Sequence, residues 1–238
     1  SGREVEQTKL LIENLDDSFH RYIYVSSAGV YKENYELPLS ENSPLDPNSR
    51  HKGKFETENW LLDQKIPFTS FRPTYIYGPG NYNKIENWFF ERLLHNKTIP
   101  IPADGSLITQ LGHVSDLSDA MIKSLDFEKS KNNIYNCSGD KGVTIKGLIY
   151  MCAEVCGLNK NEISLNKFDF QKLDSKSRKG FPIRLNHYQT DISKIKNHLN
   201  WEPKFDLLSG LRDSFINDYQ LKKDNDFDRN SDSVLFNS

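Results

Sequence analysis

Apolar residues follow two patterns along the chain, and together they predict alternating helices and strands. Residues 3–16 carry apolar side chains at helical spacing with charged residues between them, which predicts an amphipathic helix that covers a sheet. The apolar run 22–25 is followed by small and hydroxyl-bearing residues over 26–31, a pattern that predicts a buried parallel strand whose carboxyl end opens into a site. Further strands are predicted at 68–71, 107–114, 134–137 and 162–168, with an edge or bridging strand at the proline-containing 99–102.

Helices are predicted between and after these strands, at 86–96, 115–124, 144–156, 192–199 and 206–219. Thr144 and Asp206 are expected to cap their helices, and Gly157 is placed to end one of them. In the helix 86–96 we expect one face to be inward and the other partly outside, with Ile85, Phe89 and Leu93 inward and Trp88, Phe90 and Arg92 partly outside.

Composition excludes several classes of protein. The formal net charge of −2 over 238 residues gives no bulk attraction to nucleic acid or anionic membrane, so a polyanion site has to be a local patch. No apolar run approaches the length of a membrane span, and the start at Ser1 does not read as a signal peptide, so we expect a soluble protein with no membrane partner. Cys137, Cys152 and Cys156 lack metal-site spacing and suit a reducing compartment.

Two motifs stand near the amino end of the chain. The strand end Ser26-Ser27-Ala28-Gly29-Val30-Tyr31 is followed about twenty residues later by Arg50 and Lys54, which are spaced to lie on one face of a helix. This layout resembles the extended short-chain dehydrogenase/reductase superfamily, in its sugar epimerase and dehydratase branch. The resemblance matches Ser27 to the family's serine and Lys54 to the lysine of Tyr-x-x-x-Lys, but Arg50 stands where the family has its tyrosine base. A guanidinium cannot give up its proton near neutral pH, so we do not expect conventional hydride chemistry.

The superfamily resemblance also implies a nicotinamide cofactor, NAD(P), and a Rossmann-like doubly wound parallel sheet. Relatives begin with a strand and a Gly-rich turn that lets the backbone approach a pyrophosphate, and no such glycine cluster occurs here. Either this is a truncated chain with a partial sheet, which we favour, or the chain cannot hold NAD(P) in the ordinary way. If a cofactor binds, the resemblance assigns it to Ser26, Ser27, Lys54, Pro73 and Ile76. Thr109 replaces an arginine that grips the diphosphate of nucleotide sugars in many relatives.

Within the superfamily the chain is most similar to the chloroplast stem-loop binding proteins and their cyanobacterial counterparts. The similarity rests on residues 22–31, on Ser49-Arg50-His51-Lys52-Gly53-Lys54, on 75–83, on 109–114 and on 138–141. It implies RNA binding, with stem-loop-directed, divalent-metal-aided endonuclease activity in some members, and association with ribosomes or transcription complexes. It also implies a plastid stroma or the cytoplasm of a cyanobacterium-like organism.

Candidate RNA-binding residues follow from charge and aromatic content. Arg50, His51, Lys52 and Lys54 place four cationic or potentially cationic groups in five residues, and Arg grips phosphate bidentately. Tyr82, with Tyr75, Tyr77, Trp88 and Phe90, could stack on unpaired bases, although core packing is the favoured interpretation for these aromatics. The basic run Lys172 to Arg184 is interpreted as a solvated loop.

Nuclease chemistry would require carboxylates that hold Mg²⁺. Asp104, Asp116, Asp119 and Asp140 are candidates without diagnostic spacing, and His51 or His113 could act as acid or base, so the metal ligands and the cleavage residues stay unassigned.

Three parts of the chain are expected: the remaining Rossmann-like part over 1–82, a mixed substrate-side region over 83–221 whose strands return to the sheet, and an acidic, disordered tail over 222–238. Two other functions stay open. One is an NAD(P)-dependent epimerase, dehydratase or reductase in which His51 replaces the base, and the other is a scaffold that forms homo-oligomers through its helices.

Overall fold

The computed structural model describes residues 2–16, 18–34, 36–95, 98–222, 232, 235 and 236. The chain forms two compact units, each assembled from separate stretches. Unit 1 comprises 1–74, 115–140 and 189–204, and unit 2 comprises 75–114, 141–188 and 205–238. The division expected near residue 82 falls inside the first stretch of unit 2. Among the described residues, none of the helices is both long and apolar enough to cross a membrane.

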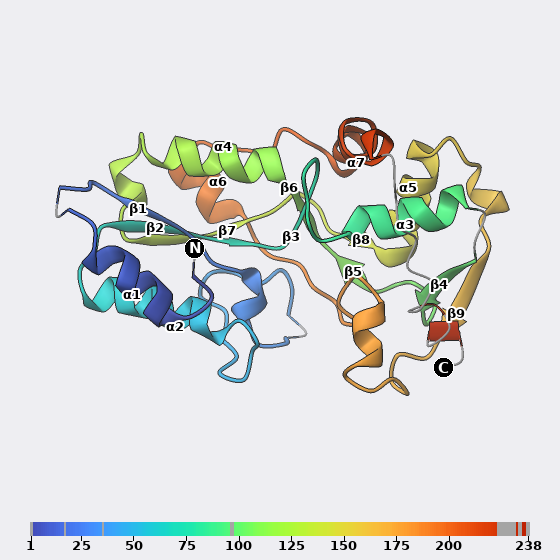
Figure 1. Ribbon diagram of the computed structural model, residues 1–238, viewed down its shortest axis with the longest axis horizontal. Coiled ribbons are helices and arrows are strands. Elements are labelled where there is room, and N and C mark those ends of the chain that lie inside the picture. The colour runs from blue at the N-terminus through green and yellow to red at the C-terminus, as the bar shows by residue number, and fades with distance from the viewer. Residues whose placement is uncertain are drawn as a thin grey trace. The chain divides into compact units, whose positions relative to one another are not determined.

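Unit 1 is a parallel sheet with helices on both faces. Its elements are α1 (Val5–Glu13), β1 (Tyr22–Val25), the 3-10 turn η1 (Ala28–Val30), α2 (Lys52–Asp63), β2 (Phe68–Pro73), α4 (Val114–Ser124), the 3-10 turn η2 (Glu128–Ser130), β7 (Asn133–Cys137) and α6 (Ser193–Leu199). The sheet order is β1-β2-β7, with Tyr22 opposite Phe68 and Thr69 opposite Asn133. Helices α1 and α2 lie on one face, and α4 and α6 lie on the other (Figure 1). The expected Rossmann-like α/β architecture is confirmed.

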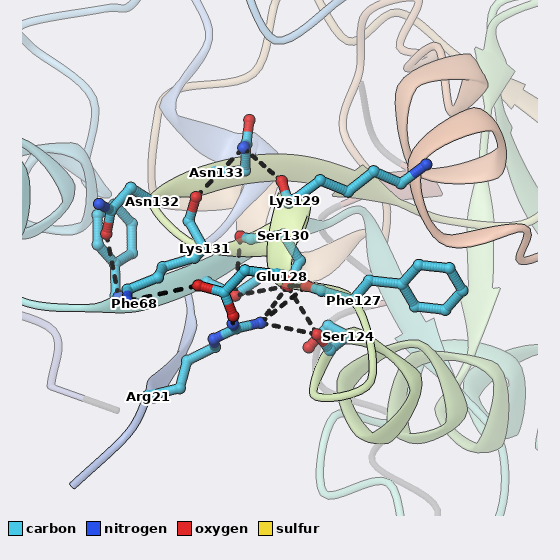
Figure 2. A network of polar contacts seen from close by, with 11 residues as sticks. Arg21, Phe68, Ser124, Phe127, Glu128, Lys129, Ser130, Lys131, Asn132 and Asn133 are labelled. Carbon is cyan, nitrogen blue, oxygen red and sulfur yellow. Dashed lines mark hydrogen bonds and ion pairs between the residues drawn. The ribbon is translucent and has the colours of Figure 1, made fainter.

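A polar clamp fixes the start of β1 to the loop before β7, as Figure 2 shows. Arg21 donates to the carbonyl oxygens of Ser124, at 2.8 Å, and Phe127, at 3.1 Å, and to the Ser130 hydroxyl. Its other nitrogen forms an ion pair with Glu128 at 3.1 Å. The Ser130 hydroxyl also reaches the Ser124 and Phe127 carbonyl oxygens, at 2.6 and 2.7 Å, so the guanidinium joins a turn that is already bonded to itself after the end of α4.

Unit 2 contains short strand pairs and three mutually packed helices. Its elements are β3 (Tyr75–Tyr77), α3 (Ile85–Leu94), β4 (Ile99–Pro102), β5 (Ile108–Thr109), β6 (Leu111–His113), β8 (Val143–Thr144), α5 (Ile145–Val155), η3 (Lys160–Glu162), β9 (Leu165–Phe168), η4 (Ser177–Gly180), α7 (Leu207–Asn217) and η5 (Tyr219–Leu221). The strands pair as β3-β6, β4-β9 and β5-β8. Its core is a large cluster of buried apolar and aromatic residues from α3, α5 and α7.

Capping and burial confirm most of the expected elements. Thr144 accepts a hydrogen bond from the Gly147 N–H, and Asp206 accepts one from the Ser209 N–H, so both cap their helices as expected. Gly157 has φ 74°, the left-handed conformation that suits a residue just past a helix end. Cys152 is fully buried and Cys156 is half-buried, in keeping with core packing.

Three expectations about the elements were wrong. Trp88, Phe90 and Arg92 are buried rather than partly outside, because α3 is surrounded on all sides within unit 2, and Arg92 stacks on the Trp88 ring and pairs with Asp232. The single strand over 107–114 is two strands, broken at the buried Gln110, because β5 and β6 pair with different partners. The strand expected from 162 begins at Leu165, since the preceding residues form η3.

The tail expected over 222–238 falls mostly on residues outside those the structure describes. Leu235 is described, and its side chain is buried in the core of unit 2.

Candidate functional site

The amino end of α2 is joined by a serine-centred turn to the segment that follows β1. The Ser49 hydroxyl donates to the Gly29 carbonyl oxygen at 2.7 Å and accepts from the His51 N–H at 3.0 Å. The turn ends at His51, whose φ of −103° and ψ of 11° are not helical, and α2 begins at Lys52. Arg50 therefore precedes the helix, and the expectation that it shares a helical face with Lys54 was wrong.

Lys54 lies in the first turn of α2 and points back to the end of β1. Its Nζ donates to the Val25 carbonyl oxygen at 2.8 Å and lies 5.1 Å from the centre of the Tyr24 ring. Burial lowers the pKa of Lys54 below its usual value, the nearby Arg3 lowers it further, and Glu58 opposes both effects. The ammonium is thus partly desolvated and held in place.

Hydroxyl groups follow the carboxyl ends of β1 and β2. Ser27 accepts a hydrogen bond from the Gly29 N–H at 3.0 Å, which caps η1. The buried Ser26 Oγ and Thr74 Oγ1 have no hydrogen-bond partner within the part of the chain that the structure describes. Buried polar atoms normally have a partner, so these two hydroxyls are the unexplained polar groups at the strand ends.

Arg50 and Lys52 are exposed, and neither forms an ion pair with any described residue. The Arg50 Nε donates to His51 Nε2 at 3.0 Å. Both cations stand at the positive end of the α2 dipole. Anionic groups from outside the chain are the partners that such an arrangement favours.

A buried ion pair holds the middle of α2 against β2. Glu58 and Arg72 are almost fully buried, and an Arg72 terminal nitrogen lies 2.6 Å from a Glu58 carboxylate oxygen. The Ser70 hydroxyl donates to the same carboxylate at 2.7 Å. This pair was not expected from the sequence, although Glu58 follows Lys54 by one helical turn on the same face of α2 as the buried Leu61, which is the pattern of an inward-facing acid.

The buried network continues from Arg72 to β7. Arg72 donates to the Tyr31 hydroxyl at 3.1 Å, and Tyr31 donates to the Asn136 side-chain oxygen at 2.6 Å. Burial raises the pKa of Tyr31 to about 12, against the opposing effect of Arg72, so its phenol keeps its proton at neutral pH. Glu41 accepts from the Asn136 N–H at 2.8 Å. The network connects α2, β2 and β7 within unit 1.

The other expected site residues are divided between the two units. Pro73 is buried at the end of β2 in unit 1, whereas Ile76 and Tyr82 belong to unit 2. Tyr82 is 85% exposed, while Tyr77, Trp88 and Phe90 are buried, so these three belong to the core, as favoured above. His113 is buried, lies 3.2 Å from Asp213 and stacks on Phe205, which indicates a structural role.

The candidate metal ligands each have a local partner. Asp116 accepts from the Lys204 N–H, Asp119 pairs with Lys204, Asp140 pairs with Lys196, and Asp104 accepts from the Ser106 N–H. Among the described residues there is no group of three or more His, Cys, Asp or Glu side chains that could hold a metal ion. The structure thus provides no support for the expected Mg²⁺ site.

The fit to a nicotinamide cofactor is partial. The Ser27 hydroxyl and the Lys54 ammonium are groups that can donate to ribose hydroxyls, and the buried Ser26 and Thr74 hydroxyls lack partners in the described chain. When bound, such a cofactor supplies hydride transfer. Arg50, which the resemblance matched to the family's base, lies outside the helix and cannot accept a proton as a guanidinium. The residues thus suit binding of the cofactor better than proton transfer.

Known proteins resemble this chain over most of its length. It is 44% identical over 233 residues to the chloroplast stem-loop binding protein of 41 kDa b from Arabidopsis thaliana, covering 95% of this chain and 60% of that protein. It is 26% identical over 202 residues to a putative UDP-glucose 4-epimerase from Methanocaldococcus jannaschii, covering 81% of this chain and 61% of that protein. The chain therefore spans about 60% of the length of these curated relatives.

Solved structures show the same fold. The UDP-glucuronic acid 4-epimerase from Bacillus cereus, in complex with UDP-glucuronic acid and NAD, matches with a TM-score of 0.73 and 20% identity, covering 92% of this chain and 68% of that one. A likeness at this identity shows the Rossmann-like fold, and the chain described here is partial relative to it. The model of the NAD dependent epimerase/dehydratase family matches residues 3–138, which is more than half of the 238 residues. The chain belongs to the NAD dependent epimerase/dehydratase family.

Proposed function

We propose that this chain is an RNA-binding protein for stem-loops, and that the amino end of α2 contacts RNA phosphates. The observation that carries the proposal is the pair Arg50 and Lys52, which are exposed and have no anionic partner among the described residues. Arg can bind a phosphate with two parallel hydrogen bonds, and Lys adds a point charge. Lys54, half-buried behind them, adds positive potential at the same helix end.

Two further observations support this proposal. The Arabidopsis relative, 44% identical, is named as a stem-loop binding protein. The resemblance also matches Arg50 to the position at which dehydrogenases of this superfamily carry their base, and an arginine there replaces a proton-transfer group by a phosphate-binding group. Tyr82, exposed on unit 2, is available to stack on an unpaired base, a contact worth about 1 to 3 kcal/mol.

We also propose a plastid or cyanobacterial setting for this chain, because the Arabidopsis relative is described as chloroplastic. Cleavage of the bound stem-loop with the aid of Mg²⁺, association with a ribosome or transcription complex, and homo-oligomer formation stay predictions. No residue is assigned to cleavage.

A second candidate function is an NAD(P)-dependent epimerase, dehydratase or reductase. Membership of the family favours it, together with the placement of Ser27 and the partly desolvated Lys54 near the end of β1. His51 would have to replace the tyrosine base in such an enzyme. The two functions differ in the ligand that binds first, RNA or NAD, which makes them separable by direct binding measurements.

The test is a salt titration of binding to a stem-loop RNA, with NAD binding measured on the same preparations. The full chain is compared with Arg50→Ala/Lys52→Ala and with a charge-matched control, Lys141→Ala/Lys160→Ala, in which both lysines are exposed on unit 2. We expect tight binding that weakens with salt, and a slope of log affinity against log salt that is smaller by roughly 2 in the Arg50/Lys52 variant alone. Saturable NAD binding without RNA binding would overturn the proposal in favour of the enzyme.

A further inference from the structure

A second cationic surface lies on unit 2, far along the sequence from α2. Residues 172–184, called the basic segment here, carry Lys172, Lys176, Arg178, Lys179 and Arg184 against one acid, Asp174. The chain as a whole has a net charge of −2, so this local excess is not a reflection of overall composition. The sequence alone suggested a solvated loop, but the structure shows a segment with fixed anchors.

Buried apolar side chains hold the basic segment in place. Leu173, Phe181 and Ile183 are buried in the core of unit 2. Between them, η4 (Ser177–Gly180) forms a compact turn in which Asp174 accepts a hydrogen bond from the Ser177 N–H at 2.6 Å. The Arg178 Nε donates to the Leu173 carbonyl oxygen at 3.0 Å. The backbone that carries the cations is therefore ordered before any ligand binds, which lowers the entropy that binding costs.

Two of the exposed lysines in the basic segment lack an acidic partner among the described residues. Lys176 and Lys179 are exposed, and neither forms an ion pair in the part of the chain that the structure describes. The charge of Asp174 acts on Lys176, but that carboxylate already accepts from the Ser177 N–H. Lys172 has only a distant contact with Asp169, at 3.6 Å. Arg184 lies over the Tyr188 ring at 4.6 Å, which orients its guanidinium.

The surroundings of these cations favour a polyanion in water over a membrane surface. A membrane-binding basic surface normally adds exposed apolar side chains that enter the lipid. In the basic segment the described leucine, phenylalanine and isoleucine are all buried, and none of the exposed large hydrophobic residues of the described chain lies in it. Rigidly spaced cations without such anchors suit the phosphate backbone of a nucleic acid.

We infer that the basic segment of unit 2 is a second phosphate-binding surface for RNA, separate from the amino end of α2, with Lys176 and Lys179 as its principal contacts. This inference rests on the proposed function, because it assigns a further part of the same ligand to unit 2. It gives each unit its own electrostatic contact with RNA. Since phosphate contacts carry no base information, the segment contributes affinity and placement rather than sequence preference.

The test compares the full chain with Lys176→Ala/Lys179→Ala and with the same control, Lys141→Ala/Lys160→Ala. We expect the salt slope of stem-loop binding to fall by roughly 2 in the Lys176/Lys179 variant and to stay at the wild-type value in the control. A second readout is acetylation of lysines with and without RNA, followed by mass spectrometry. Bound RNA should protect Lys176 and Lys179 and leave Lys141 and Lys160 reactive.

The outcomes separate this inference from the proposed function. An unchanged salt slope in Lys176→Ala/Lys179→Ala, with equal acetylation of both lysines in the presence and absence of RNA, overturns the inference. If Arg50→Ala/Lys52→Ala then still lowers the slope, the proposed function stands without it. A wild-type chain that binds no stem-loop RNA overturns both. The four lysines are exposed, so unfolding midpoints of the variants should match the wild type.

Discussion

Helix α2 and the turn before it carry two kinds of charged residue: one is buried and paired within the fold, and the other is exposed and unpaired among the described residues. Glu58 is buried and meets Arg72 and Ser70 from the same unit. Arg50 and Lys52, eight and six residues earlier, are exposed and meet no acid in the described chain. A buried charge is tolerated only when the fold supplies its counter-ion, whereas an exposed one can await a partner from outside. The buried charge of α2 therefore has its partner inside the fold, and the exposed charges are the ones for which we propose a partner from outside.

The largest expected change in stability follows from removing the buried partner of Arg72. Glu58→Ala leaves the Arg72 guanidinium without its counter-ion in the interior, which should lower the free energy of unfolding by about 3 to 5 kcal/mol. Urea denaturation measures this change. The control is Glu56→Ala, an exposed acid on the same helix, which should change the free energy by less than about 0.5 kcal/mol. Equal effects of the two substitutions would show that the buried pair does not hold α2.

A smaller loss of stability is expected from a substitution at Gly53, where residues 3 and 4 pack closely against the first turn of α2. Alanine normally favours a helix over glycine by about 1 kcal/mol, but a Cβ at Gly53 would overlap the Arg3 carbonyl oxygen and lie 2.6 Å from Glu4 Oε2. Gly53→Ala should therefore destabilise the fold by about 1 to 3 kcal/mol in urea denaturation. In the control Gly147→Ala, the added Cβ meets only side-chain atoms, at 3.0 Å or more, so a smaller loss is expected there. A stabilised Gly53→Ala would contradict the close packing.

The partly buried Lys54 should make the unfolding free energy depend on pH in the alkaline range. Its pKa in the folded chain lies below the usual 10.5, first because of burial and then because of Arg3. The unfolded chain consequently binds more protons in this range, so Lys54 makes the unfolding free energy rise as pH increases towards 10.5. Lys54→Met should flatten this rise relative to the wild type, as measured by urea denaturation at a series of alkaline pH values. An identical pH profile in the two chains would mean that Lys54 is not desolvated.

The smallest expected change in stability belongs to the exposed cations. Arg50→Ala/Lys52→Ala should alter the unfolding free energy by less than about 0.5 kcal/mol, because neither side chain has a described ionic partner to lose. Thermal and urea unfolding of this variant, set beside Glu58→Ala, would complete the comparison. A loss approaching that of Glu58→Ala would mean that these cations are structural, and would weaken the case for a binding role.

Much of the fold could be predicted because its patterns are local. Periodicity located α1, β1, β2 and α5, and the capping residues Thr144 and Asp206 needed only their own neighbours. The start of α2 could not be placed, because the Ser49 hydroxyl bonds to Gly29, a residue twenty positions away. The burial of Trp88, Phe90 and Arg92 depended on α5, α7 and Asp232, which surround α3 from later in the chain.

The candidate site was predictable in its residue types but not in its contacts. The motif spacing identified Ser27, Arg50 and Lys54 from sequence. The partnership of Glu58 with Arg72 was not identified, since the two residues lie on different elements and each has many possible partners. The Lys54 hydrogen bond to a main-chain carbonyl of β1 was equally beyond a side-chain motif. The basic segment shows the same limit, because only the buried positions of Leu173 and Phe181 distinguish an anchored loop from a solvated one.

The division of unit 1 into three stretches has a consequence for synthesis on the ribosome. The stretch 189–204 leaves the ribosome only after the whole of 75–188 has been made. At about 5 to 20 residues per second this delay is on the order of ten seconds. Until β7 arrives, the edge of β2 that will receive it has no strand beside it. During translation, unit 1 is therefore completed only after most of unit 2 has been synthesised.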